Sequence, residues 1–300
     1  MKLKKLTVCN YHMLEKRTYK SLGHIRVDKI SPLDIQKFVK TLMDAGLAPN
    51  SLRNYIRFVS VILNYAVKKR VALYNPCTTA DLPKLNQPKR DFYSIEEGKE
   101  FLEHLRAESS EKFNYAVFFT LAMYTGCRKG ELLGLEFKDI DFENNIISIN
   151  RAYYYSNYDK ITFTDTPKSA NSIRNIKVPR HIIQLISKLK RWQKERRLLA
   201  GASWEENDRL FTDGFGKTLH PRSMENYLFH LCKRTGMRKV KIHSFRHFNA
   251  SVLISKGVDV VTVQHALGHS SASTTLSVYS HAFNTSQTKA MEAIAQAIDF

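Results

Sequence analysis

The sequence contains no apolar run approaching the twenty residues that a membrane-spanning helix requires. It has only 4 cysteines, and they lie far apart without a C-x-x-C pair: Cys9, Cys77, Cys127 and Cys232. Because no signal peptide precedes them, we interpret them as reduced thiols of a cytoplasmic protein rather than a disulfide framework. Cys127 is expected to be a buried apolar residue, since no separate base is evident beside it.

Acidic residues are also scarce, with 28 Asp and Glu against 47 Lys and Arg and a net charge of +19. Residues 1–93 contain 18 basic and 6 acidic side chains, a net charge of +12, and the remaining residues carry +7. An excess concentrated in a small N-terminal part indicates a polyanionic partner, most often DNA or RNA. A merely solvated basic surface is the alternative.

The N-terminal part is predicted to be helical, with helices near residues 8–20, 31–46 and 49–70. Ser31-Pro32 is a good helix start, because serine caps and proline is tolerated at the first position. Pro83 to Arg90 is polar, basic and proline-bearing, which is typical of an interdomain linker. Four basic residues of the third helix are candidates for phosphate contact, although they could form a solvated face: Arg53, Arg57, Lys68 and Lys69.

A buried helix is predicted over residues 112–124, ending at Thr125-Gly126, and Arg128 follows directly as another helix begins. Glu131 lies three residues later on that helix, so it can pair with Arg128 and fix its direction. By itself this motif is equally explained by a structural ion pair.

Short strands come next, at residues 146–149, 153–155, 161–164 and 176–178, followed by a long basic helix over 180–199. Lys168 lies in the loop between the last two strands, where lysines are usually solvated. Leu210 and Phe211 are expected to form a short buried strand. The pattern predicts a mainly α protein with a small antiparallel β-sheet.

The C-terminal part gathers residues that can hold and attack a phosphate. His243 and Arg246 lie one turn apart on a predicted helix that ends at Gly257. A helix over 259–267 leads to His269, and a short helical segment leads to Tyr279. Arginine presents a rigid fork of donors to phosphate, and tyrosine can attack phosphorus and hold it covalently.

A metal site is the rival interpretation of the same histidines. His243 with His247, and His265 with His269, are pairs at i,i+4 spacing, which can share a metal ion. Neither pair contains the glutamate of an H-E-x-x-H motif, and no acidic cluster lies nearby. Because metal-dependent phosphoryl transfer normally uses carboxylates, a metal-dependent nuclease is disfavoured.

Several motifs, in this order and spacing, resemble the tyrosine recombinase (phage integrase) family. They are Thr125-Gly-Cys-Arg128-Lys-Gly-Glu131, Thr166-Pro-Lys168, His243-Ser-Phe-Arg246-His, Leu267-Gly-His269 and Tyr279. Residues 22–32 also resemble that family's core-binding domain. The resemblance is to integrases of phages and of integrative conjugative elements or conjugative transposons.

The resemblance implies a role for each matching residue. Tyr279 would attack a DNA phosphodiester to give a 3′-phosphotyrosyl link. Arg128 and Arg246 would clamp the phosphate oxygens, with Glu131 in support, and Lys168 would protonate the leaving 5′ oxygen. His243 would act in proton transfer, and His269 would hydrogen-bond the phosphate. No metal, ATP or other cofactor is implied.

The implied fold is a two-domain clamp on double-stranded DNA. Its parts would be a helical core-DNA-binding domain over 1–85, a linker over 86–93, a catalytic domain over 94–284 and a tail helix over 285–300. We expect the tail to dock on a neighbouring protomer rather than in cis, and the N-terminal domain to be a shortened form. The expected assembly is a homotetramer on element ends and attachment sites in a bacterial cytoplasm, with accessory excision or DNA-bending proteins as further partners. A DNA-binding regulator that kept the fold without cleavage is the alternative function.

Overall fold

The computed structural model describes residues 3–85, 91–166 and 173–268. The chain divides into two compact units. The first comprises residues up to Lys89 together with Ser156–Ile161, and the second comprises Arg90–Tyr155 and the chain from Thr162 onward. Among the described residues, no helix combines the length and apolar character needed to cross a membrane.

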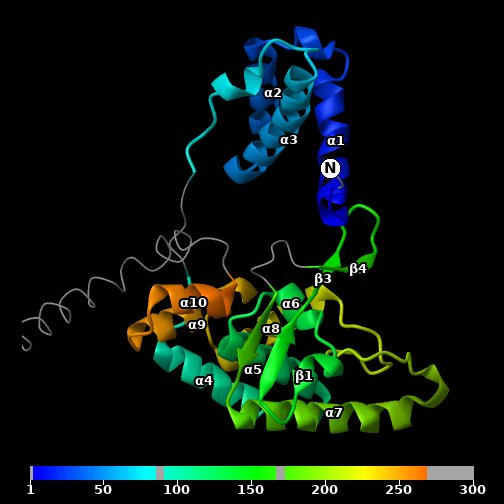
Figure 1. Cartoon of the computed structure of the whole chain (residues 1–300), viewed down its shortest axis with the longest axis vertical. Helices are drawn as coiled ribbons and strands as arrows, with labels where there is room; N and C mark the ends of the chain where they lie inside the picture. The colour runs from blue at the N-terminus through cyan, green and yellow to red at the C-terminus, as the bar shows by residue number, and fades with distance from the viewer. Residues whose placement is uncertain (1–2, 86–90, 167–172, 269–300) are drawn as a thin grey trace, which may run out of the picture. The chain divides into compact units, whose positions relative to one another are not determined.

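The first unit contains three helices (Figure 1): α1 (Lys5–Leu22), α2 (Pro32–Asp44) and α3 (Pro49–Lys68), with 3-10 turns at Val27–Lys29 and Pro76–Thr79. They enclose an apolar core. Ile35 and Leu42 of α2 meet Leu63 of α3 in this core, and all three are fully buried. Ser31 caps α2 as expected: its hydroxyl accepts from the backbone of Asp34, and the Asp34 carboxylate accepts from the Ser31 backbone at 3.0 Å.

The second unit contains seven α-helices within its described residues. They are α4 (Ile95–Arg106), α5 (Phe113–Thr125), α6 (Lys129–Leu133), α7 (Arg180–Ala200), α8 (Pro221–Thr235), α9 (Ile242–Ser255) and α10 (Val260–Leu267). Further 3-10 turns lie at Ser110–Lys112, Phe137–Asp139 and Gly201–Ser203. Helix α5 has apolar residues on all of its faces, which is the pattern of a helix buried at the centre of a domain.

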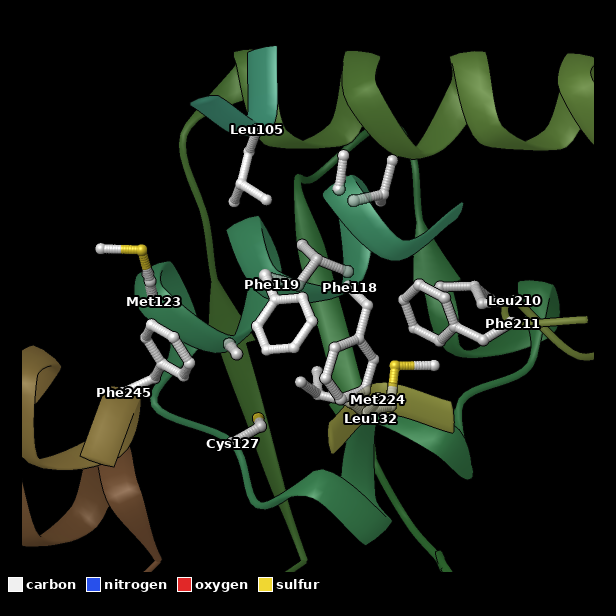
Figure 2. Close-up of a cluster of buried hydrophobic side chains, with 14 of the residues drawn as sticks. Leu105, Phe118, Phe119, Met123, Cys127, Leu132, Leu210, Phe211, Met224 and Phe245 are labelled. Carbon is white, nitrogen blue, oxygen red and sulfur yellow. The ribbon is translucent and has the colours of Figure 1, made fainter. Parts of the chain in front are cut away.

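Figure 2 shows how the other elements cover α5. Phe118 and Phe119 lie at the centre of the cluster, with Phe245 of α9 on one side and Leu210 and Phe211 on the opposite side. The rings of Phe119 and Phe245 meet edge to face at 5.4 Å between centroids. Because α9 is fixed against α5 by this core, the polar residues at the adjoining ends of the two helices have defined positions.

The strands form two small antiparallel sheets. β1 (Ile140–Asp141), β2 (Ile146–Ile149) and β5 (Arg174–Lys177) make one sheet in the order β1-β2-β5, and β3 (Ala152–Tyr155) pairs with β4 (Thr162–Asp165) in the other. The mainly helical fold with small antiparallel sheets confirms the predicted fold class. In the three-stranded sheet, Ile149 is the register partner of Arg174.

The prediction of a strand at Leu210 and Phe211 is wrong. Both side chains are fully buried, as predicted, but the backbone bends between two isolated bridges that pair Glu136 with Arg209 and Thr212 with Thr218. The Leu210 amide donates to the Leu135 carbonyl at 3.0 Å, and the Phe211 carbonyl accepts from Leu219 at 3.1 Å. Two buried residues with scattered backbone partners are too short a segment to form a ladder.

Replacing Phe119 by alanine tests the role of the α5 core. We expect the free energy of unfolding to fall by about 3–5 kcal/mol, because a fully buried ring leaves a cavity that the surrounding helices cannot close. Chemical denaturation followed by circular dichroism measures the change. Phe215→Ala is the matched control, because Phe215 is 57% exposed and should change stability by less than about 1 kcal/mol. Equal losses for both variants would contradict this description of the core.

Candidate active site

Arg128 lies at the turn that joins α5 to α6. Gly126 ends α5 with a left-handed φ of 61°, and a Cβ at that position would lie 2.5 Å from Leu267 and 2.9 Å from Asn249. Glycine is therefore required for its conformation and for the close approach of α9 and α10. The chain leaves this tight turn directly into Arg128, which is the N-cap residue of α6.

Arg128 and Glu131 form the ion pair that their spacing predicted. Arg128 Nη1 donates to Glu131 Oε1 at 2.6 Å, and the Arg128 backbone amide donates to Oε2 at 3.0 Å. The carboxylate is buried, with a side chain 3% exposed, while the side chain of Arg128 remains 39% exposed. Glu131 thus holds the guanidinium group by Nη1, while the arginine side chain remains partly accessible.

Arg174 is a third member of this cluster that the sequence did not reveal. Its Nη2 donates to Glu131 Oε2 at 3.0 Å and lies 3.3 Å from the sulfur of Cys127. Burial alone would raise the pKa of Glu131, but the charges and hydrogen bonds of Arg174 and Arg128 outweigh it and lower that pKa below its ordinary value. Glu131 is therefore ionised at neutral pH despite its burial.

Helix α9 presents Arg246 to the C-terminal end of α5. Arg246 Nη1 donates to the Gly126 carbonyl at 2.9 Å, and Asn249 Nδ2 donates to the carbonyls of Met123 at 2.9 Å and Tyr124 at 3.0 Å. These carbonyls have no partner within the helix and lie at the negative end of its dipole. Burial, followed by the nearby charge of Arg128, lowers the pKa of Arg246 to about 9. Arg246 therefore remains charged at neutral pH.

His243 lies one turn before Arg246 on the same helix. Its ring meets that of His247 edge to face at 5.0 Å between centroids, and part of the residue is open to solvent. Partial burial, followed by the charges of Arg246 and Arg128, lowers the pKa of His243 below 6.5. The imidazole is therefore mainly neutral at pH 7 and able to accept a proton.

The C-terminal end of α10 closes the cluster. Arg128 Nη2 donates to the Gly268 carbonyl at 3.2 Å, and Arg174 Nε donates to the Ala266 carbonyl at 2.9 Å. Gly268 ends α10 with a φ of 67°, as the Leu-Gly-His sequence suggests. The two arginines that share Glu131 thus also hold the last turn before His269.

The structure brings together four of the residues predicted for the site: Arg128, Glu131, His243 and Arg246. Lys168, His269 and Tyr279 lie outside the described residues. Arg174 and Asn249 were missed, because each acts on backbone or side-chain atoms far away in the sequence. Cys127 is buried as expected, and burial raises the pKa of its thiol, so it is an apolar packing residue.

Of the basic residues predicted for DNA contact, Arg53, Arg57 and Lys68 lie on α3 and Lys69 is its C-cap residue, and three of the four have local partners. Arg53 donates to the Pro83 carbonyl at 2.7 Å, Arg57 lies 3.4 Å from Asn54, and the Lys69 ammonium lies 5.7 Å from the ring centroid of Tyr65. These contacts do not test phosphate binding, so the assignment of Arg53, Arg57, Lys68 and Lys69 stays a prediction. Among the described residues, no group of three His, Cys, Asp or Glu side chains could hold a metal ion around the His243/His247 pair.

Electrostatics gives the cluster an excess of positive charge. Three guanidinium groups, those of Arg128, Arg174 and Arg246, interact with one carboxylate, that of Glu131. Buried cations need compensating charge, and the lowered pKa values of Arg246 and His243 have the surrounding cations among their causes. The arrangement is suited to receive an anion with oxygen acceptors.

Comparison with known proteins identifies the family. The phage integrase family matches residues 93–286. The chain belongs to this family. It is 29% identical over 264 residues to the ICEBs1 integrase of Bacillus subtilis, covering 87% of this chain and 69% of the relative. It is also 29% identical over 286 residues to an XerC-like tyrosine recombinase of Caldanaerobacter subterraneus, covering 90% of this chain and 72% of the relative.

A solved structure shares the fold. The Tn1549 transposon integrase in complex with transposon right end DNA superposes with a TM-score of 0.81 at 20% identity, covering 98% of this chain and 95% of that chain. The family and these relatives establish the protein as a tyrosine-type, site-specific DNA recombinase. They do not favour a metal-dependent nuclease or a regulator without cleavage.

Glu131→Gln tests the charge balance of the recombinase cluster. Removing the charge leaves two guanidinium groups against a neutral amide, so we expect a loss of about 3 kcal/mol in the free energy of unfolding at pH 7. Folding lowers the pKa of Glu131, so its contribution is complete above pH 4.5 and disappears as the pH falls through the lower folded-state pKa. The variant should therefore lose less stability than the native protein on acidification below pH 4.5.

Chemical denaturation at a series of pH values measures both effects. Glu206→Gln is the control, because Glu206 pairs with Arg197 on the surface and both side chains are more than half exposed. Its stability should stay within about 1 kcal/mol of the native value. Parallel stability curves for the native protein and Glu131→Gln would show that Glu131 is not held ionised by the two arginines.

Proposed function

We propose that this recombinase cleaves and rejoins DNA through a 3′-phosphotyrosyl intermediate formed by Tyr279, without a metal ion or ATP. The observation that carries the proposal is the cluster of the arginines Arg128, Arg174 and Arg246 around the ionised Glu131 carboxylate, with the neutral His243 beside it. Its guanidinium groups offer a phosphate positive charge, which a metal ion would otherwise supply, together with hydrogen-bond donors. The family membership supports the same chemistry.

Arg128 and Arg246 would bind the two non-bridging oxygens of the scissile phosphate. Guanidinium groups remain charged at neutral pH and donate in a planar fork that fits phosphate oxygens. Negative charge on those oxygens increases as the fifth bond to phosphorus forms, so fixed donors bind the transition state more strongly than the ground state. His269, which follows the last turn of α10, would add a hydrogen bond to the phosphate.

Proton transfer completes the reaction. The Tyr279 hydroxyl would give its proton to His243, whose lowered pKa leaves it neutral and able to accept. The phenolic oxygen forms a bond to phosphorus as the bond between phosphorus and the 5′ oxygen breaks. Lys168 would give a proton to that leaving oxygen. Because the phosphotyrosyl ester conserves the bond, a 5′-hydroxyl can reverse the attack on a new strand without ATP.

The proposed partner is double-stranded DNA at element ends and attachment sites of a mobile genetic element. Support comes from the net charge of +12 in residues 1–93 and from the related integrase structure, which contains transposon DNA. We propose residues 1–85 as the core-DNA-binding domain, 86–93 as the linker, 94–284 as the catalytic domain and 285–300 as a tail that docks on a neighbouring protomer. We further propose a homotetramer on two duplexes, with accessory excision or DNA-bending proteins as additional partners.

A nicked suicide substrate tests the proposed nucleophile. The native protein should form a covalent protein–DNA adduct that withstands denaturing electrophoresis, and Tyr279→Phe should form none. Tyr74→Phe is the control, because Tyr74 is exposed in the first unit and should form adduct at the native rate. The reaction should proceed equally in chelator, since no metal ion takes part. An adduct formed by Tyr279→Phe, or none with the native protein, would refute the assignment.

A substrate with a 5′-bridging sulfur tests Lys168. Lys168→Ala should cleave the ordinary phosphodiester about 100- to 10,000-fold more slowly, because the alkoxide leaving group lacks its acid. A thiolate leaves without a proton, so the bridging phosphorothiolate should restore cleavage to near the native rate. Single-turnover cleavage of both substrates measures the effect. A defect of the same size on both would remove Lys168 from the role of general acid.

A further inference from the structure

Arg174 belongs to the cluster around Glu131, but the proposed reaction assigns it no role. We propose that Arg174 is a positioning residue of the recombinase, which fixes the Arg128 guanidinium through Glu131 and fixes the end of α10 that leads to His269. This inference rests on the proposed function, because it assigns the two groups that Arg174 places to the phosphate site. Its side chain is 8% exposed, so its head group acts within the protein.

The first contact sets the direction of Arg128. Glu131 receives Arg128 Nη1 on Oε1 and Arg174 Nη2 on Oε2, so one carboxylate is held from both sides. Without Arg174, the donor that remains to Oε2 within the described part of the chain is the backbone amide of Arg128. The carboxylate could then rotate about its terminal bond, and the guanidinium bound to Oε1 would move with it.

The second contact sets the last turn of α10. Arg174 Nε donates to the Ala266 carbonyl at 2.9 Å, and Arg128 Nη2 donates to the Gly268 carbonyl at 3.2 Å. Both carbonyls belong to a helix end that lacks internal partners. Because His269 follows Gly268 directly in the sequence, Arg174 restrains the backbone just before that histidine.

The position of Arg174 in the chain adds a third restraint. Arg174 is the first residue of β5 and the register partner of Ile149 in β2. It lies six residues after Lys168 in the sequence, and its own position is fixed by the sheet and by Glu131. One side chain thus connects the segments that contribute Arg128, Lys168 and His269.

The contacts require an arginine rather than any cation. Nε reaches the Ala266 carbonyl while Nη2 reaches Glu131 and lies beside the Cys127 sulfur, so the bonds leave a planar group in different directions. A lysine ammonium is a single nitrogen on a flexible stem and cannot reproduce this geometry. Arg174→Lys therefore keeps the charge and removes the positioning.

The experiment compares native protein, Arg174→Lys and Arg174→Gln on the nicked suicide substrate. We expect the dissociation constant for DNA to stay within about 2-fold for Arg174→Lys, because the charge is retained and the side chain of Arg174 is only 8% exposed. The single-turnover cleavage rate should fall about 10- to 100-fold, as expected when a catalytic group is displaced by about 1 Å. Arg174→Gln should cleave more slowly still, because the charge that opposes Glu131 is also lost.

A methylphosphonate at the scissile position separates positioning from general structural damage. This group lacks one charged non-bridging oxygen, so its cleavage depends less on a well-placed Arg128. The defect of Arg174→Lys relative to native protein should therefore shrink by about 10-fold on the methylphosphonate. A merely structural role would lower both rates by the same factor.

Arg234→Gln is the matched control. Arg234 pairs with the buried carboxylate of Glu108 in the same unit, on elements that do not contribute to the cluster. This variant should lose stability yet cleave both substrates at native rates below its unfolding temperature. The proposal is overturned if Arg174→Lys cleaves at the native rate, or if its rate falls by the same factor on both substrates. Absence of any adduct with the native protein would instead overturn the proposed function.

Discussion

The Glu131 carboxylate between two guanidinium groups is the interaction on which the site depends. Placing an ionised acid in the interior is costly unless charge and hydrogen bonds compensate it. Arg128 and Arg174 supply both, and the pKa of Glu131 falls despite burial. Since the two arginines come from α6 and β5 and also hold the end of α10, a single carboxylate fixes three elements at one point.

The hydrophobic core brings the remaining residues to that point. The rings of Phe119 and Phe245 pack α5 against α9, so the polar face of α9 meets the carbonyls at the end of α5. Arg246 and Asn249 satisfy those carbonyls, which gives α9 a fixed rotation. The site is therefore built on helix ends held by a rigid core, and it does not depend on the conformation of long loops alone.

Contacts between residues that are close in the sequence could be predicted, whereas contacts between distant residues were missed. Arg128 and Glu131 are three residues apart at one helix start, so their pairing follows from helical geometry. Arg174 reaches Glu131 across 43 residues and Ala266 across 92, and no periodicity records such contacts. The strand was expected to begin at Ile176, which left Arg174 in a loop. Conversely, the burial of Leu210 was predictable from its apolarity, whereas its irregular backbone pairing was not.

In the proposed reaction, the charge of Glu131 also affects whether the cluster binds the ground state or the transition state of the phosphate more strongly. Three guanidinium groups against one carboxylate leave two positive charges, whereas a bound phosphodiester carries one negative charge. As the Tyr279 oxygen attacks, the negative charge around phosphorus rises toward two while His243 gains the tyrosine proton, so the cluster would attract the transition state more strongly than the ground state. Without Glu131 the cations would bind any anion strongly, including the ground state, and would add little to the rate. In the proposed reaction, Glu131 would therefore limit the positive charge of the cluster as well as direct Arg128.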